Sequence, residues 1–443
     1  MRRGLVGGAV VAAVVAAAGL WWLRGPGPMA FADGPKVALA DYHGSDPTGV
    51  PASLAKASLV ERGEYLARAA DCMVCHTVSG GQAYAGGLAF KLPFGALYST
   101  NITPDKETGI GNYSDQEFLD AIHRGVRRDG ARLYPAMPFV SYTYITDADA
   151  LAIKAYLFSL APVRAAPPAN TLMFPFDQRW AMTFWSVLFN RDKRFEPDSD
   201  KSPEWNRGAY LAEALAHCGE CHTPRNLAFA LDNREKFAGA VAAGWHAYNI
   251  TSDKGSGVGA WTDDQLVSYL STGHAAGRGT ASGPMGEAVD ESFSRMAPED
   301  IRALVAYLRS VPAVASSEPA TLAPPASQSP KSGGTADARG KMVFQGACVS
   351  CHGWTGESPL TPFATLTGAR AVNDPGAINV AQIVISGTKR QSPPGALSMP
   401  AFGSAYSDEE IAAVANYVTA RFGGKASQIT EQDVAALRKQ TSQ

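Results

Sequence analysis

The sequence predicts an all-α fold made of three tandem domains of one kind. One pattern occurs three times along the 443 residues. It consists of a short helical segment, a pair of cysteines, a loop region and a closing amphipathic helix. Repetition on this scale is typical of a chain that repeats one folding unit. Little of the repeat alternates polar and apolar residues with a period of two, as a half-buried strand would. We therefore expect helices to dominate every repeat.

The repeats define three domains, which we call units one, two and three. Each opens with a helical pattern that leads into its cysteines and closes with a helix whose apolar residues recur at i, i+3 or i+4, and i+7. In units one and two, Ser114 and Thr262 start Ser/Thr-x-x-Glu/Gln capping patterns that predict one more helix. The units span 55–162, 203–312 and 336–423, with closing helices expected at 147–160, 297–311 and 407–422.

Three segments lie outside the units and the N-terminal region. Residues 313–335 are rich in Pro, Ala and Ser and predict an extended linker, and 424–443 form a C-terminal tail. The connector, 163–202, gathers large aromatic residues within Met173–Phe189. Such a density indicates either a surface that lies on a partner subunit, a membrane or another domain, or an apolar seam between domains.

Residues 1–34, at the N-terminus, are predicted to be an export segment. Two arginines precede an uncharged run, Gly4–Leu23, which ends next to Arg24. The run has 20 residues, more than the roughly 7–15 of a signal-peptide core and enough to cross a bilayer. Its Trp21-Trp22 pair suits a membrane interface. We expect a retained anchor, with a cleaved signal as the alternative; either way the remaining chain is exported.

The composition is that of a globular protein with no affinity for nucleic acid. Hydrophobic residues make up 46% of the chain, which is ordinary for a protein with a buried core. Charged residues make up 18% and the formal net charge is −2, so no basic surface for nucleic acid is expected. The six cysteines are the informative part, because all of them fall into three Cys-x-x-Cys pairs.

Each cysteine pair is followed at once by a histidine. The spacing Cys-x-x-Cys-His lets two thiols form thioethers with the vinyl groups of one haem and puts the imidazole on the iron as proximal ligand. Disulfides would not require the histidine, zinc ribbons need pairs packed together, and a thioredoxin-like pair would be single. The motifs predict three haems c, attached at Cys72 and Cys75, Cys218 and Cys221, and Cys348 and Cys351, with His76, His222 and His352 as proximal ligands.

A methionine recurs shortly before each closing helix and is the candidate sixth ligand. Met137, Met285 and Met399 follow their proximal histidines by 61, 63 and 47 residues and lie beside proline or glycine. A single methionine is normally a core residue, but these repeat with the unit and are expected in loops. In unit two, Met296 is a competitor that looks like a core position at the start of the closing helix.

The other polar repeats and histidines are expected to be structural. Asn101-Ile102-Thr103 and Asn249-Ile250-Thr251 match in units one and two, and we interpret them as loops near the haem rather than glycosylation sites. The remaining histidines have no counterparts in all three units, which favours surface or hydrogen-bonded roles. These are His43, His123, His217, His246 and His274.

Together, these motifs resemble one family. The three Cys-x-x-Cys-His units, the Asn-Ile-Thr loops and the Pro-flanked methionines are similar to the triheme cytochrome c subunit of membrane-bound periplasmic dehydrogenases, over nearly all of the chain after about residue 55. The resemblance implies three cytochrome-c-like haem domains, thioether links at the six cysteines, proximal histidines and distal methionines. The long N-terminal run departs from the cleaved signals of many family members, which leaves the mode of membrane attachment open.

The resemblance also implies a function. A separate dehydrogenase subunit of quinoprotein, flavin or molybdenum type would oxidise its substrate, and this chain would pass the electrons to ubiquinone or a terminal oxidase. It would lie at the periplasmic face of the inner membrane and would not itself be an enzyme. The alternatives are a haem subunit of a cytochrome oxidase complex, or a haem enzyme whose iron keeps an open position, against which the three methionines argue.

Overall fold

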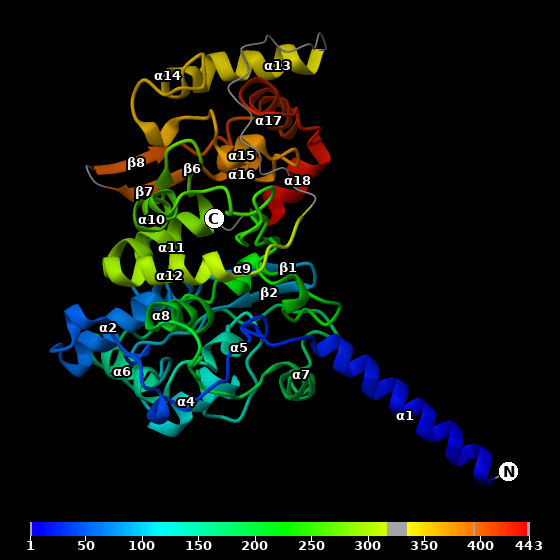
Figure 1. The fold of residues 1–443 in the computed structure, drawn as a ribbon. Helices are drawn as coiled ribbons and strands as arrows, with labels where there is room; N and C mark the ends of the chain where they lie inside the picture. The colour runs from blue at the N-terminus through cyan, green and yellow to red at the C-terminus, as the bar shows by residue number, and fades with distance from the viewer. Residues whose placement is uncertain (1, 317–334, 393–394, 441–443) are drawn as a thin grey trace.

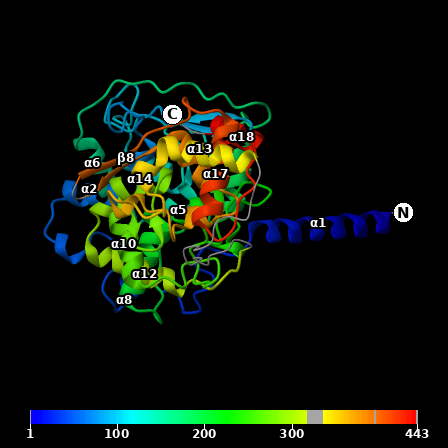
Figure 2. The same ribbon diagram turned by 90° about the horizontal axis from the view of Figure 1, so that it is seen from above.

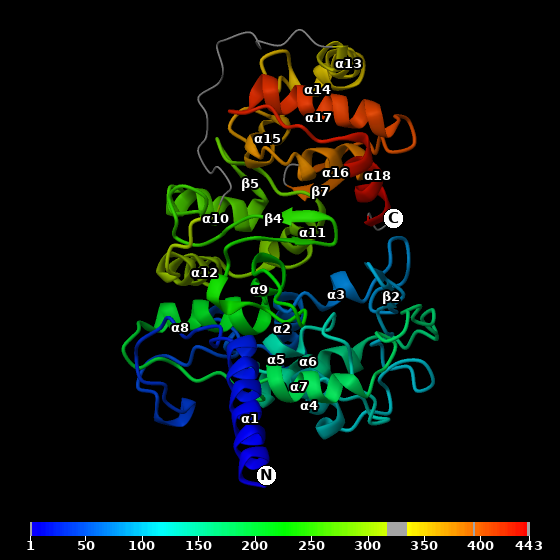
Figure 3. The same ribbon diagram turned by 90° about the vertical axis from the view of Figure 1, so that its right-hand side faces the viewer.

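The computed structural model of the chain describes residues 2–316, 335–392 and 395–440. Unit one lies at one end, unit two in the middle and unit three at the other end (Figures 1 and 3). The predicted helical character is confirmed, but the described part also contains four two-stranded antiparallel hairpins. A purely α fold was therefore too strict a prediction. Strands of two to five residues are too short to show a clear alternating pattern.

Unit one begins with a helix that leads into the turn with its cysteines and ends with the closing helix, which packs on that opening helix. Ser58 and Ser114 cap α2 and α4 through reciprocal bonds with Glu61 and Glu117, so the capping predicted at Ser114 is confirmed. The elements are α2 (Leu59–Ala69), α3 (Cys72–Cys75), β1 (Ala89–Leu92), β2 (Gly95–Tyr98), α4 (Asp115–Arg124), α5 (Phe139–Tyr142) and α6 (Asp147–Ser159).

Unit two repeats this order with an extra two-stranded hairpin, β5 and β6, after its second long helix. Thr262 caps α10 as predicted, through Gln265. The elements are α8 (Pro203–Tyr210), which continues as the π-helix η3 (Leu211–Leu215), then α9 (Gly219–His222), β3 (Ala240–Ala242), β4 (Trp245–Ala247), α10 (Asp263–Thr272), β5 (His274–Ala275), β6 (Gly279–Thr280), α11 (Gly283–Glu291) and α12 (Pro298–Ser310).

Unit three has the same opening and closing helices, followed by a helix that the sequence did not indicate. The C-terminal tail forms α18 (Glu431–Gln440), which buries Val434 and Leu437 and packs against α16 and α17. The other elements are α13 (Thr335–Val343), the π-helix η6 (Phe344–Cys348), α14 (Val349–His352), α15 (Arg370–Asn373), α16 (Ile378–Ser386), β7 (Thr388–Ser392), β8 (Gly395–Met399) and α17 (Asp408–Phe422). Most of the expected linker, 317–334, lies outside the described residues.

One helix crossing recurs in all three units and fixes the frame around the cysteines. The opening helix crosses the closing helix at a glycine: α2 on α6, α8 on α12 and α13 on α17. In unit two, a Cβ added to Gly208 would overlap the backbone oxygen of Ala303 and the Cβ of Tyr307. Gly63 and Gly340 meet the equivalent Ala–Tyr pairs of the other closing helices. Glycine is required here because the two backbones touch.

Replacing Gly208 by valine should destabilise unit two without touching its cysteines. The added side chain would force the helices apart, and overpacking of this kind costs about 1–3 kcal/mol. Denaturant unfolding of the haem-loaded chain measures the change. Glu204→Val, at an exposed position on the same helix, is the matched control and should change the free energy of unfolding by less than about 0.5 kcal/mol. Equal stability of the two variants would contradict a tight crossing.

The apolar core is continuous through units one and two and separate in unit three. One cluster of buried residues joins α2 and α6 of unit one to α8 and α12 of unit two, whereas a second cluster contains only residues of unit three and the C-terminal tail. Units one and two therefore share a core, and unit three docks on them as its own domain. The Asn-Ile-Thr loops match in units one and two, but the sequence did not predict that these two units share a core.

The connector forms α7 (Ala181–Phe189), and the two faces of this helix differ. Trp185 turns inward: its ring lies edge-on to Phe139 and its Nε1 donates to the Ala228 carbonyl at 2.8 Å. Phe184 and Val187 are 70% and 75% exposed. One face of the helix is thus an apolar seam between units, and the other is an uncovered apolar surface.

The first helix, α1 (Arg2–Arg24), points away from the rest of the molecule (Figures 1 and 2). Asn226 holds its end by donating from Nδ2 to the Leu23 carbonyl at 2.9 Å, and Arg234 stacks 4.1 Å over the Trp22 ring. Among the described residues, no helix combines the length and the apolar character needed to cross a membrane. The expected spanning run begins within 1–10, whose side chains lie outside the described part.

Candidate haem-binding site

The three cysteine motifs form short helical turns directly after the opening helices. In unit one the turn is α3; in units two and three α9 and α14 follow the π-helices η3 and η6. None of the six cysteines is joined to another by a disulfide, so both sulfur atoms of each motif remain for attachment of a haem. The opening helix delivers two thiols and one imidazole to the same place in each unit, as thioether attachment requires.

Each histidine of a motif is oriented by one hydrogen bond to a backbone carbonyl. The Nδ1 atoms of His76, His222 and His352 each lie 2.6 Å from a carbonyl oxygen, in Thr100, Tyr248 and Ala364 respectively. With Nδ1–H donating to that oxygen, Nε2 keeps its lone pair and the ring is fixed. A histidine that binds a metal normally has such a partner on its other nitrogen. The residues present therefore fit a haem iron at each motif.

Burial sets the protonation of these groups. It lowers the pKa of His76 and His352 and brings that of His222 to about 4, so the imidazoles are neutral near pH 7. Burial also raises the pKa of the Cys72 and Cys218 thiols to about 12. A reactive redox pair needs the opposite, a lowered thiol pKa. The arrangement favours a metal-binding imidazole over thiol–disulfide chemistry.

The Asn-Ile-Thr loops support the carbonyls that orient the histidines. Asn249 is fully buried; its Nδ2 donates to Ser256 Oγ at 2.9 Å and its Oδ1 accepts from the Thr251 backbone at 2.8 Å. Asn101 makes the same bonds to Thr108 and Thr103 in unit one. The predicted structural role is confirmed, because a buried and bonded asparagine cannot carry a glycan. The carbonyl acceptors were missed, although the acceptors in units one and two directly precede these loops.

The candidate methionines are half-buried, but only one of them lies in a loop as expected. Met137 lies in the turn before α5, whereas Met285 is in the first turn of α11 and Met399 ends β8. The helix begins at Gly283, two residues before Met285, and it tolerates Pro284 because the first helical positions need no backbone N–H donor. Met137 and Met285 pack against the shared core of units one and two, and Met399 against the core of unit three. Met296 is 8% exposed and belongs to the core, as expected.

The attachment turns of units one and two adjoin each other. Ser141 Oγ donates to Glu220 Oε1, inside the second motif, at 2.9 Å. His217, which precedes that motif, lies edge-on to Tyr142 with ring centroids 5.4 Å apart. The hydroxyl of Tyr142 in turn donates to the Ala70 carbonyl at the entrance of the first motif. His217 is thus a seam residue, and the first two sites are held by one network.

Unit three contacts the proximal side of the second site. Arg370 donates to the Asn249 carbonyl at 3.1 Å and stacks 4.5 Å over the Tyr248 ring, whose carbonyl holds His222. Asp374 Oδ2 accepts from the Tyr248 hydroxyl at 3.2 Å and lies 3.0 Å from His246 Nδ1. The three motifs are therefore parts of one connected assembly, and His246 is structural, as expected.

Comparison with known proteins gives the family. The model of the family described as Cytochrome c matches residues 60–161 and 338–421, which fall in units one and three. The fructose dehydrogenase cytochrome subunit of Gluconobacter japonicus is 38% identical over 421 residues, 89% of this chain and 85% of the relative. The gluconate 2-dehydrogenase cytochrome c subunit of Pantoea cypripedii is 39% identical over 403 residues, 86% of this chain and 90% of the relative.

A longer relative shares the same region. A nicotinate dehydrogenase subunit of Pseudomonas putida is 41% identical over 369 residues, 83% of this chain, but the chain spans only 30% of that protein's length. The fructose and gluconate dehydrogenase relatives, which match over most of their own length, are cytochrome subunits, and a diheme cytochrome c-type of Cereibacter sphaeroides is 33% identical over 321 residues, 71% of this chain and 100% of the relative. With its helical units and its carbonyl-oriented motif histidines, the chain belongs to the family of cytochrome c subunits of dehydrogenase complexes, and is an electron-transfer subunit rather than a catalytic one.

Proposed function

We propose that this chain carries three covalent haems c and passes electrons from a separate dehydrogenase subunit to ubiquinone or a terminal oxidase. The observation that carries the proposal is the threefold recurrence of one proximal geometry, a motif histidine tied at 2.6 Å to a backbone carbonyl. A haem held in this way supplies reversible one-electron chemistry at its iron. The surrounding residues bind the group, fix the imidazole and exclude water.

The proposed sixth ligands are Met137, Met285 and Met399. Support comes from their shared surroundings, since each packs against the same apolar cluster as the first cysteine of its own motif. A thioether ligand favours the reduced iron and therefore raises the reduction potential. It also closes the sixth position, which suits an electron carrier and not an enzyme that must bind a substrate at the metal.

The proposed partner is a periplasmic dehydrogenase subunit of quinoprotein, flavin or molybdenum type. Its support is the nature of the relatives, which are cytochrome subunits of fructose and gluconate dehydrogenases. The proposed location is the periplasmic face of the inner membrane, with the N-terminal segment as the attachment. The projecting position of α1 supports this location, because a helix that leaves the body can enter a bilayer without unfolding the units.

Isolation of the chain from its native membranes tests the proposal. A tagged chain, extracted in mild detergent, should bring down a larger catalytic subunit, and adding that enzyme's substrate should reduce the haems. In the matched control, the cytochrome stripped of the large subunit should stay oxidised with the same substrate. Recovery of an oxidase core in place of a dehydrogenase, or reduction of the stripped cytochrome, would contradict the proposal.

A further inference from the structure

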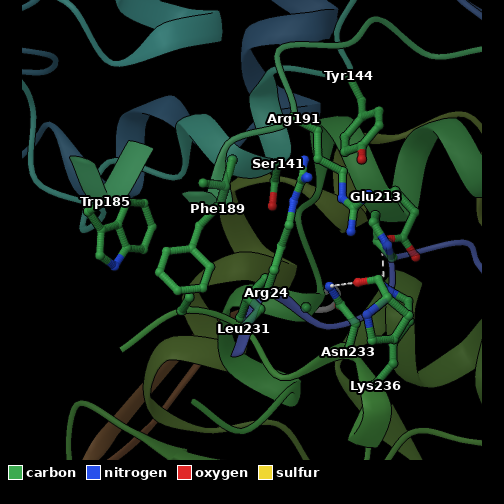
Figure 4. A pocket seen from close by; sticks show the side chains of 15 residues that line it. Arg24, Ser141, Tyr144, Trp185, Phe189, Arg191, Glu213, Leu231, Asn233 and Lys236 are labelled. Atoms are coloured by element: carbon green, nitrogen blue, oxygen red, sulfur yellow. Dashed lines mark hydrogen bonds and ion pairs between the residues drawn. The ribbon is translucent and has the colours of Figure 1, made fainter. Parts of the chain in front are cut away.

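A cavity lies where α1 meets the body of the molecule. Its walls come from the end of α1, from α7 and from units one and two (Figure 4). Its volume is about 50 Å³, which suits a small group or a few water molecules and is too small for a haem. It lies outside the three motif sites, although Gly219 of the second motif forms part of one wall. The function proposed above does not use it.

The side chains that line this cavity carry more positive than negative charge. Three basic residues, Arg24, Arg191 and Lys236, line it together with one carboxylate, Glu213 (Figure 4). Glu213 is already neutralised, because Lys236 Nζ lies 2.7 Å from it and the Tyr307 hydroxyl donates to it. Two positive charges therefore remain.

The two arginines have no acidic partner in the described part of the chain. Arg191 donates from Nη2 to the Gly25 carbonyl at 3.1 Å, which ties it to the root of α1 but leaves its charge uncompensated. Both guanidinium groups act on the buried Tyr144 hydroxyl: burial raises the pKa of Tyr144 to about 12, and Arg191 and Arg24 oppose that rise. Two guanidinium groups and a hydroxyl converging in one cavity are the donors that a phosphate group accepts best.

Exposed apolar residues lie on the elements that form the cavity wall near the root of α1, and we call them the apolar collar: Trp21, Trp22, Phe184, Val187 and Leu227. Each of these side chains is more than half exposed, and Leu227 is 91% exposed. They are neighbours, since α1 contacts α7, Asn226 bonds to the end of α1, and Trp185 of α7 bonds to Ala228. An exposed patch of this kind, with tryptophans at its edge, is typical of a surface that meets lipid.

We infer that the cavity binds the phosphate of an anionic phospholipid head group and fixes the root of α1 at the bilayer surface. The inference rests on the proposed membrane location and extends it. The arginines match the phosphate charge, the collar matches the acyl region beside it, and α1, which carries Arg24 and both tryptophans, projects from the body at this place. A soluble anion would leave the collar unexplained, and an apolar protein surface would leave the two charges unpaired.

Native mass spectrometry of the complete haem-loaded complex, released from detergent, tests this inference. Phosphatidylglycerol, phosphatidylcholine, deacylated glycerophosphoglycerol and inorganic phosphate are added in separate arms. The wild type should retain one phosphatidylglycerol per chain, at least about tenfold more strongly than the other three, since two charge-assisted hydrogen bonds and the collar act together. Arg24→Gln with Arg191→Gln should lose the adduct, and Arg191→Lys alone should keep part of it. Arg302→Gln, an exposed arginine on α12, is the matched control and should behave as wild type.

Each other outcome overturns the inference. Equal retention of phosphatidylcholine, or an adduct with inorganic phosphate as strong as with the lipid, would exclude an anionic lipid site. If the double variant keeps the lipid but loses the dehydrogenase subunit during purification, the face is a protein interface. Failure here is distinct from failure of the proposed function, because haem content and reduction by the dehydrogenase are measured on the same samples and do not depend on either arginine.

Discussion

Replacing Cys218 and Cys221 together by serine is expected to leave the mature chain with two covalent haems. The thioethers of the second motif cannot form, and a haem that is only coordinated is lost on denaturation. Pyridine haemochrome absorbance per denatured chain measures the change. Ser350→Ala, inside the third motif but between its cysteines, is the matched control and should keep the wild-type haem content.

The same double variant should also weaken units one and two as a pair. Cys218 packs against the core that these units share, so an empty second site leaves a void in that common core. Thermal unfolding followed by circular dichroism should show an earlier transition for units one and two than for unit three, whose core is separate. An unchanged haem count, or a transition that moves for unit three alone, would contradict the assignment of this motif.

Met399→Leu is expected to open one iron to external ligands while every haem stays attached. Leucine keeps the volume of the side chain but offers no electron pair to the metal, so the fold should persist. About one third of the methionine–iron charge-transfer band should disappear, and the reduced protein should bind carbon monoxide at one iron per chain. Absorption spectroscopy before and after addition of carbon monoxide measures both effects.

Unit two offers an internal comparison for this assignment. Met285→Leu should reproduce the effect of Met399→Leu, whereas Met296→Leu should not, because Met296 is a core residue at the start of the closing helix. An unchanged band in Met399→Leu would show that this iron takes another ligand. Carbon monoxide binding by Met296→Leu and not by Met285→Leu would reverse the assignment in unit two.

The repeated helices could be predicted from the sequence because their signals are local. Apolar periodicity and capping residues such as Ser114 and Thr262 act within one or two turns, and the helices α4 and α10 follow them as expected. The hairpins could not be predicted. In β3 and β4, for example, three residues pair with three, and too few side chains alternate to distinguish a strand from a loop.

The candidate site, like the fold, could be predicted only in part from the sequence. The cysteines and histidines could be predicted because they form a contiguous motif, and haem attachment requires the spacing of that motif. The groups that accept the histidine N–H bonds could not be predicted from a motif, because they are backbone carbonyls, which every residue has. The three residues that supply them share no side-chain feature: Thr100, Tyr248 and Ala364. The inward turn of Trp185 and the common core of units one and two depend on tertiary packing, which three similar repeats do not encode locally.

The haem content of the mature wild-type chain tests the central claim most directly. The chain is isolated from its native membranes, denatured so that only thioether-linked haem remains, and weighed by intact-protein mass spectrometry beside a pyridine haemochrome measurement. Three carbonyl-oriented motif histidines predict that the mass of the chain increases by the mass of three haems. The haemochrome absorbance should likewise correspond to three haems per chain. A fully matured chain with two haems or fewer would contradict the account.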